Sequence, residues 1–166
     1  SGEITELTPF LSISWKSRAY SSGVLKTNMV GNYNLYNFLA AICIGNYFDI
    51  KGIDISDAIA GYKPKNNRSQ VLETKKNKLI IDCYNANPTS MLLALESFRS
   101  FQHDKKIAIL GDMLELGQDS EQEHQKILDY CTNNEIKLIT VGPIFKKLNK
   151  NQACESVEQV SSELIS

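Results

Sequence analysis

IDCYNANPTSM, residues 81–91, joins the end of an apolar run to the start of a helix. Residues 78–83 form a short run with β-branched members, which is typical of a strand. Asn87 stands where a helix N-cap is expected, and Pro88 takes the first helical position, where its missing N–H costs nothing. The stretch therefore predicts a strand, a polar loop and a helix.

The loop between this predicted strand and helix, with the first helical turn, is rich in polar side chains: Asp82, Tyr84, Asn85, Asn87 and Ser90. Ligands bind at the carboxyl ends of such strands, close to the free N–H groups of a helix start. We therefore interpret the loop as one side of a binding site. A capped strand-to-helix turn that binds nothing explains the same residues equally well, and the loop alone does not decide between the two.

A second motif, GNYNLYNFLAA at residues 31–41, places Asn34 and Asn37 three positions apart at the start of a predicted helix. Side chains at this spacing lie on one face of a helix, so the two amides are expected to lie together. Amides in such a pair can hydrogen-bond the edge of a nucleotide base. The alternative is that Asn34 only caps the helix, and the spacing alone favours that alternative.

A third motif, KIAILGDMLELG at residues 106–117, predicts another strand that ends in glycine and acid. A capping box of Ser120 and Glu123 predicts the helix after it. His124 shares helical spacing with three apolar residues further along, so we expect it at the edge of the core rather than in a site. A plain strand-to-helix connection without a ligand is again the alternative.

The order of elements predicts an α/β fold in two parts, divided near residue 64. Glycine, proline and asparagine at residues 61–67 interrupt both strand and helix periodicity and mark the linker. The first part is expected to hold strands over 10–15 and 24–27 and helices over 34–47 and about 55–60. The second is expected to be a Rossmann-like, mostly parallel sheet with right-handed crossovers, because helices separate the last three of its four strands. Those four strands are expected near residues 69–73, 79–83, 107–110 and 137–141.

The composition is that of an ordinary globular protein, with 42% hydrophobic residues in 166. Eighteen basic and 19 acidic residues leave a net charge of −1, which argues against nucleic acid or an anionic membrane as a partner. No segment has the length of a transmembrane helix and the start SGEITEL does not resemble a signal peptide, so we expect a cytoplasmic protein. Cysteine spacing predicts reduced thiols, and no metal site built by protein side chains alone is expected.

Taken in this order, the three motifs and Arg68 resemble those of the Mur ligases of peptidoglycan synthesis, over about residues 9–142. The string Asp-x-Tyr-Asn-Ala-Asn-Pro-x-Ser-Met is the specific part, because sister ligases carry other residues after the aspartate. It resembles the branch of the family whose amine substrate is D-alanyl-D-alanine. Tyr33 departs from the pattern, since many members carry histidine there, and no polar role is assigned to it.

The resemblance implies an ATP-dependent amide ligase that also uses Mg²⁺. In that reaction ATP phosphorylates the terminal carboxylate of UDP-MurNAc-tripeptide, and the amine of D-alanyl-D-alanine attacks the acyl phosphate. Residues 1–64 would be the tail of the central ATPase domain and residues 65–166 most of the C-terminal domain, so the other domains of the same polypeptide are implied partners. Because no G-x-x-x-x-G-K-[ST] loop occurs here, the chain alone is expected to be inactive, without a complete catalytic set and with most magnesium ligands elsewhere.

The resemblance also implies roles for individual residues. Asn34, Asn37, Arg68 and Asp82 are placed at ATP. Of these, Asn37 is expected to bond the adenine, Arg68 to reach phosphate with its permanent charge, and Asp82 to accept from the two ribose hydroxyls. The loop and the neighbouring strand end are assigned to D-alanyl-D-alanine through Tyr84, Asn85, Asn87, Ser90 and Asp112. Asp112 and Glu115 could both bind the ammonium group of the dipeptide. The alternative is that they are solvent-facing acids at the start of a helix.

Two other functions stay open. One is a related ligase with a different amine, such as the folylpolyglutamate enzymes that share the architecture, although the asparagine-rich loop argues against it. The other is a free-standing α/β module that binds a nucleotide at the same strand ends. Such a module would bind nucleotide without another domain, whereas a ligase fragment would bind little, because the phosphate contacts lie in the missing domain.

Overall fold

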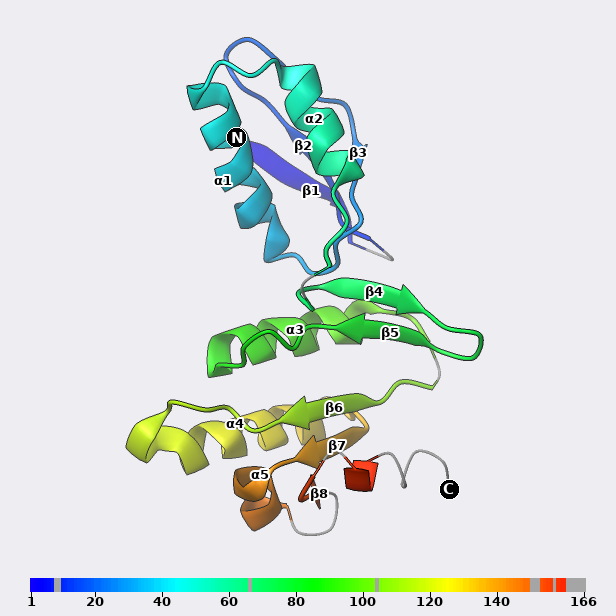
Figure 1. Ribbon diagram of the computed structural model, residues 1–166, viewed down its shortest axis with the longest axis vertical. Helices are drawn as coiled ribbons and strands as arrows, with labels where there is room; N and C mark the ends of the chain where they lie inside the picture. Colours follow the sequence, from blue (N-terminus) through cyan, green and yellow to red (C-terminus); the bar gives the residue numbers. More distant parts are fainter. Residues whose placement is uncertain (8–9, 66, 104, 150–152, 157, 161–166) are drawn as a thin grey trace. The chain divides into compact units, whose positions relative to one another are not determined.

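The computed structural model describes residues 1–7, 10–65, 67–103, 105–149, 153–156 and 158–160 of the chain (Figure 1). Two compact units make up the chain, Ser1–Tyr84 and Asn85–Ser166. The domain boundary near residue 64 stays a prediction.

In the first unit, an antiparallel sheet packs against two helices (Figure 1). The strands lie in the order β1 (Gly2–Glu6), β2 (Ser12–Trp15) and β3 (Leu25–Lys26). The helices are α1 (Asn34–Tyr47), as predicted, and α2 (Gly52–Gly61), which begins before the predicted start. Their shared core is formed by Leu11, Ile13, Trp15, Met29, Phe38, Ile42, Ile55 and Ile59.

Alternation along β2 explains how this core forms. Leu11, Ile13 and Trp15 point to the same side, because successive side chains in a strand face opposite ways, and all three are buried. The indole N–H of Trp15 donates to Oγ of Ser56 over 3.1 Å, which satisfies its one polar group inside the core. β2 thus fixes α2 by a hydrogen bond as well as by apolar contact.

The first unit ends in a hairpin. β4 (Gln70–Glu73) pairs antiparallel with β5 (Lys78–Ile81), with Gln70 opposite Ile81. Both strands were predicted, but as part of the mostly parallel sheet of the second part; the structure pairs them with each other, antiparallel, in the first unit. Because β5 ends at Ile81, Asp82 directly follows its carboxyl end and faces the residues that lead into β4.

The second unit has the predicted Rossmann-like α/β character, with a parallel sheet. Its strands lie in the order β6 (Ala108–Gly111), β7 (Leu138–Val141) and β8 (Ala153–Cys154). The helices are α3 (Pro88–Ser100), α4 (Ser120–Asn133) and α5 (Pro143–Leu148), with a short 3₁₀ turn, η1 (Gly117–Asp119), before α4. Buried side chains from these elements form its core: Met91, Leu95, Ala108, Met113, Ile127, Leu128, Cys131 and Phe145.

The two predicted helix starts of this unit have different outcomes. Asn87 caps α3 as predicted: its Oδ1 accepts from the Ser90 N–H over 2.9 Å, and the Ser90 hydroxyl accepts from the Asn87 N–H over 3.2 Å. The prediction of a capping box formed by Ser120 and Glu123 is wrong. Residue Asp119 before α4 already has helical φ and ψ because η1 leads directly into the helix, so Ser120 lies inside it and no side chain caps it.

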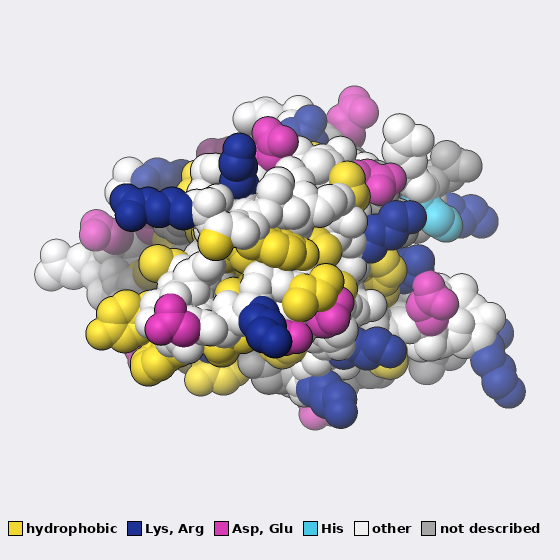
Figure 2. Space-filling model, turned by 90° about the horizontal axis from the view of Figure 1, so that it is seen from above, with side chains coloured by type: hydrophobic (Ala, Val, Ile, Leu, Met, Phe, Trp, Pro, Cys, Tyr) yellow, Lys and Arg dark blue, Asp and Glu magenta, His cyan; other side chains and the backbone are white. Residues whose placement is uncertain are grey.

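Large apolar side chains stay exposed in the first unit, and yellow hydrophobic side chains interrupt the charged surface on the face shown in Figure 2. Many of them come from α1, the segment that joins it to α2, and the start of α2: Tyr36, Ile44, Tyr47, Phe48, Ile50 and Ile53. Surface of this kind is typical of a contact with another protein segment.

Candidate functional site

The two asparagines at the start of α1 are hydrogen-bonded to each other. Nδ2 of Asn37 donates to Oδ1 of Asn34 over 2.9 Å. Nδ2 of Asn34 donates in turn to the Val30 carbonyl over 2.7 Å and to Oγ of Ser69 over 3.0 Å. These acceptors fix the orientation of the Asn34 amide. Asn34 is the first residue of α1 and does not cap it, so the capping alternative is wrong.

Ser69 and Tyr33 connect this pair to Asp82. The Tyr33 hydroxyl donates to Oδ2 of Asp82 over 2.9 Å and lies 2.8 Å from Oγ of Ser69. An ionised carboxylate only accepts hydrogen bonds, so the single Tyr33 proton points to Asp82 and the Ser69 hydroxyl donates to Tyr33. The Ser69 backbone N–H also donates to Oδ1 of Asp82, over 3.1 Å.

The result is a directed chain of hydrogen bonds that runs from Asn37 through Asn34, Ser69 and Tyr33 to Asp82. Its middle is buried, with Asn34 only 1% and Ser69 only 2% exposed. Its two ends, the Asn37 amide and the Asp82 carboxylate, are exposed. A buried polar scaffold thus holds two solvent-facing groups that can bind a ligand. We call these five residues the polar chain.

The backbone before β4 is strained where it enters the polar chain. Asn67 and Ser69 both have positive φ, 57° and 48°. A left-handed serine costs about 1–2 kcal/mol relative to an ordinary conformation. The Asn67 carbonyl accepts from the Cys83 N–H over 2.8 Å, which ties this bend to the end of β5. The bend brings both the N–H and the hydroxyl of Ser69 to the polar chain.

Tyr33 remains a hydrogen-bond donor throughout the neutral pH range. Burial raises its pKa to about 12, and the negative charge of Asp82 adds to the rise. The phenol is therefore protonated wherever Asp82 is ionised under ordinary conditions. The sequence assigned no polar role to Tyr33, and the structure shows one.

Arg68 stacks on Tyr84 at the edge of the same unit. The guanidinium carbon lies 3.7 Å from the centre of the Tyr84 ring, a cation–π contact. Both side chains are exposed. The contact holds the predicted phosphate-binding arginine against Tyr84, and Arg68 directly precedes Ser69 of the polar chain.

In the second unit, the loop before α3 bonds mainly to itself. Asn87 and Ser90 use their side chains to cap the helix. Oδ1 of Asn85 accepts from the Ala86 N–H over 2.9 Å, and Asn85 is exposed. Contacts of these residues with D-alanyl-D-alanine stay predictions, and Asn85 is the one whose side chain does not hold the helix.

Asp112 caps α5. Its Oδ2 accepts from the Ile144 N–H over 2.9 Å and its Oδ1 from the Phe145 N–H over 3.0 Å. Gly142 allows this close approach, because a Cβ there would lie 2.4 Å from the Asp112 carboxyl carbon and because its φ is 122°. The structure therefore gives Asp112 a role in the fold, and its predicted contact with the dipeptide stays a prediction.

His124 is fully buried beside Asp112, deeper in the core than the edge position predicted from the sequence. Its Nε2 accepts from the Met113 N–H over 2.9 Å, and its Nδ1 lies 2.7 Å from the Ser120 carbonyl. This pairing requires the neutral ring with the proton on Nδ1. His124 therefore connects the end of β6 to α4.

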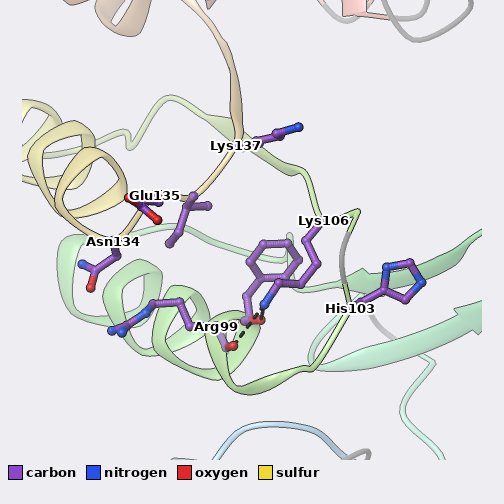
Figure 3. Close-up of a pocket in the computed structure, with 8 residues that line it drawn as sticks. Arg99, His103, Lys106, Asn134, Glu135 and Lys137 are labelled. Carbon is purple, nitrogen blue, oxygen red and sulfur yellow. Dashed lines mark hydrogen bonds between the residues drawn. The ribbon is translucent and has the colours of Figure 1, made fainter.

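A hollow of about 270 Å³ lies at the other end of the parallel sheet (Figure 3). Lys106 and Lys137 line it just before β6 and β7 begin, together with Arg99 and His103. Nζ of Lys106 donates to the carbonyls of Phe98, Arg99 and Phe101, which are the last unpaired acceptors of α3. The hollow thus contains a lysine-capped helix end and none of the predicted ligand-binding residues.

Within the part of the chain that the structure describes, no group of three or more His, Cys, Asp or Glu side chains is arranged to hold a metal ion. None of the described helices is long and apolar enough to cross a membrane. No disulfide joins the four cysteines, all of which lie in the described part of the chain; Cys43 and Cys83 are exposed and Cys131 and Cys154 are buried.

A sequence model described as the glutamate ligase domain of Mur ligases matches residues 67–164. The chain belongs to the Mur ligase family. This confirms the resemblance seen in the motifs, and the match includes Arg68, Asp82 and the whole loop before α3.

Three curated Mur ligases match between 51% and 86% of the chain. A UDP-N-acetylmuramoyl-tripeptide–D-alanyl-D-alanine ligase from Bacillus subtilis is 39% identical over 59% of the chain, and one from Treponema pallidum is 29% identical over 86%. A UDP-N-acetylmuramate–L-alanine ligase from Clostridium botulinum is 32% identical over 51% of the chain. The matches cover only 22%, 29% and 19% of these relatives' own lengths.

Solved Mur ligases share the fold. A D-alanyl-D-alanyl ligase from Acinetobacter baumannii aligns with 98% of the chain at a TM-score of 0.85, with 23% identity and 36% of its own length covered. The MurF ligase from Thermotoga maritima in complex with ADP aligns with 98% of the chain at a TM-score of 0.80, with 18% identity and 39% of its length covered. Both likenesses agree with the α/β class expected from the order of elements.

Proposed function

We propose that this chain is part of an ATP-dependent Mur ligase that joins D-alanyl-D-alanine to UDP-MurNAc-tripeptide in the synthesis of peptidoglycan precursors. The family is shared with ligases of that activity from two bacteria. The observation that carries the nucleotide half of the proposal is the polar chain, which presents an amide and a carboxylate from a buried scaffold.

The exposed ends of the polar chain suit a nucleoside. Each oxygen of the Asp82 carboxylate accepts one bond from the protein, from Tyr33 or from the Ser69 N–H, and keeps further lone pairs for the vicinal hydroxyls of a ribose. Asn37 donates one N–H to Asn34 and keeps its other N–H and its Oδ1 for the donor and acceptor of an adenine edge. We assign Asn37 to the base and Asp82 to the ribose. Asn34 acts on both indirectly, because it bonds Asn37 and is connected to Asp82 through Ser69 and Tyr33.

Arg68 is the proposed contact to phosphate. Its guanidinium carries a permanent charge and a fixed fork of donors, and the face that stacks on Tyr84 leaves the N–H edge available. Bound ATP would supply the phosphoryl group that activates the carboxylate of the tripeptide. Magnesium is proposed to be held mostly by residues outside this chain, together with the nucleotide's phosphates.

Recognition of D-alanyl-D-alanine is proposed for the loop before α3. Asn85 offers an exposed amide, Tyr84 an exposed ring, and Asn87 and Ser90 hold the loop by capping α3. Asp112 accepts one bond on each oxygen from the start of α5, and its side chain is only 8% exposed, so little of it is open to the dipeptide.

We also propose that the chain works only within a longer polypeptide, with residues 1–64 completing a central ATPase domain and residues 65–166 forming most of the C-terminal domain. The missing phosphate loop and the exposed apolar side chains of α1 support this division. Small-molecule substrates and the remaining domains would then be its partners, and the cytoplasm its location.

The alternative is a sister ligase with another amine, since an L-alanine ligase matches at 32% identity. Its support is weaker, because the Asn-Ala-Asn-Pro-x-Ser-Met string of the loop follows the D-alanyl-D-alanine branch. Competition between D-alanyl-D-alanine and L-amino acids in a single assay distinguishes the two.

Substitutions in the full-length protein test both halves of the proposal. Asp82→Ala is expected to raise the KM for ATP and lower kcat, while Asp57→Ala, an exposed acid on α2, leaves both unchanged. Asn85→Ala is expected to raise the KM for D-alanyl-D-alanine more than the KM for ATP. Wild-type kinetics in Asp82→Ala would remove that residue from the site, and equal effects of Asn85→Ala on both substrates would defeat the loop assignment.

A further inference from the structure

We propose that Tyr33 and Ser69 are positioning residues that hold the Asp82 carboxylate for ribose and link it to the asparagines that meet the base. This inference rests on the proposed function, in which Asp82 accepts from the ribose hydroxyls. Neither residue was assigned a role by the motifs, and neither is expected to touch the nucleotide itself.

The geometry around Asp82 supports the first half of this inference. An exposed aspartate ordinarily samples several rotamers, which costs entropy when it must bind a ligand in one of them. Here the Tyr33 hydroxyl holds Oδ2 at 2.9 Å and the Ser69 N–H holds Oδ1 at 3.1 Å. Donors on both oxygens fix the position of the carboxylate and the tilt of its plane.

The direction of the bonds supports the same half. Both groups donate to Asp82, so the carboxylate keeps its negative charge and its remaining lone pairs for hydroxyl donors. Tyr33 does not ionise near neutral pH, because burial raises its pKa to about 12. The orientation is therefore the same throughout the neutral pH range.

The buried middle of the polar chain supports the second half. Ser69 accepts from Asn34 and donates to Tyr33, and it is 2% exposed in a strained backbone conformation with φ 48°. Such strain persists only where surrounding bonds impose it. Because Asn34 also holds Asn37, a displacement of Ser69 would move the base-binding amide and the ribose-binding carboxylate together.

Nucleotide binding to the full-length protein tests the inference. Affinities for ATP and 2′-deoxyATP are measured by isothermal titration calorimetry, in wild type and in Tyr33→Phe, Asp82→Ala and Tyr36→Phe. Tyr36 is the matched control, since it loses the same hydroxyl three residues further along the chain but is 75% exposed. Tyr33→Phe is expected to weaken ATP binding about tenfold and 2′-deoxyATP binding much less, so that the preference for ATP falls.

The outcomes separate this inference from the function on which it rests. If Asp82→Ala abolishes the preference and Tyr33→Phe lowers it while Tyr36→Phe does not, the positioning role is supported. If Asp82→Ala abolishes the preference and Tyr33→Phe keeps the wild-type ratio, the positioning role is overturned and the ribose contact stands. If Asp82→Ala keeps the ratio, the ribose contact fails and the positioning role fails with it.

A second variant guards against a folding defect. Should the thermal melt show that Tyr33→Phe is unfolded, Ser69→Ala tests the same polar chain, because it keeps the N–H bond to Asp82 but loses the hydroxyl that joins Asn34 to Tyr33. A folded Ser69→Ala protein is expected to lose part of the preference for ATP over 2′-deoxyATP. An unchanged ratio would overturn the role of Ser69.

Discussion

A single proton sets the direction of the hydrogen bonds around Tyr33. Its hydroxyl lies within bonding distance of both Asp82 and Ser69, and only Ser69 has a proton to give back. The same reasoning fixes Asn34, whose Nδ2 faces two acceptors. The buried residues satisfy one another's hydrogen-bond donors and acceptors inside the protein. Asn37 and Asp82 therefore keep donors and acceptors on the solvent side that a ligand can use.

Tyr33 makes stability depend on pH in the alkaline range. In an unfolded chain the phenol ionises near 10, and in the folded protein its pKa is raised to about 12. Its contribution is therefore complete below about pH 10 and is lost as the pH rises toward about 12. In denaturant titrations, Tyr33→Phe is expected to flatten the fall of unfolding free energy across this window. A fall as steep as in wild type would show that another group titrates there.

At the scale of elements, a helix start is predictable from the sequence only when its cap is local. The cap of α3 was predictable, because Asn87, Pro88 and Ser90 are neighbours in the sequence and need no distant partner. The start of α4 was not, because η1 carries helical backbone up to Asp119 and displaces the expected cap. The cap of α5 depends on Asp112, 32 residues before Ile144, and spacing does not reveal such a pair.

The start of α5 gives a prediction at this scale. Gly142→Ala is expected to destabilise the protein by about 1–3 kcal/mol, because its positive φ disfavours a side chain and its Cβ would displace the Asp112 carboxyl. Gly111→Ala is the matched control in the same unit, since a Cβ there meets nothing within 4 Å. Chemical denaturation measures both. Equal stability of the two variants would contradict the role of Asp112 as the cap of α5.

At the scale of the whole molecule, the motifs predicted the family, the α/β class and the ends of the polar chain. They predicted Asn34 in its middle, but not Ser69 or Tyr33. Tyr33 and Ser69 are 36 residues apart, and only the fold of the first unit brings them together. Ser69 follows Arg68 just past the predicted linker, at the start of a predicted strand, and its strained conformation has no signature in a sequence without glycine at that position. The sequence thus predicted the residues of local motifs, but not the contacts between residues far apart in the chain.

This chain contains only part of the residues that the proposed reaction requires. It carries the proposed base, ribose and dipeptide contacts, and it has no loop of the kind that cradles ATP phosphates. The curated relatives are several times longer, with 22% and 29% of their lengths covered. A complete reaction is therefore expected only from the longer polypeptide.

The most direct test is ATP-dependent phosphate release by the full-length protein, supplied with UDP-MurNAc-tripeptide and D-alanyl-D-alanine, with each substrate omitted in turn and this chain assayed alongside. We predict release by the full-length protein only when all three substrates are present, and none by the chain alone. A full-length protein that is folded but inactive with this pair, or that prefers another amine, would contradict the proposed function.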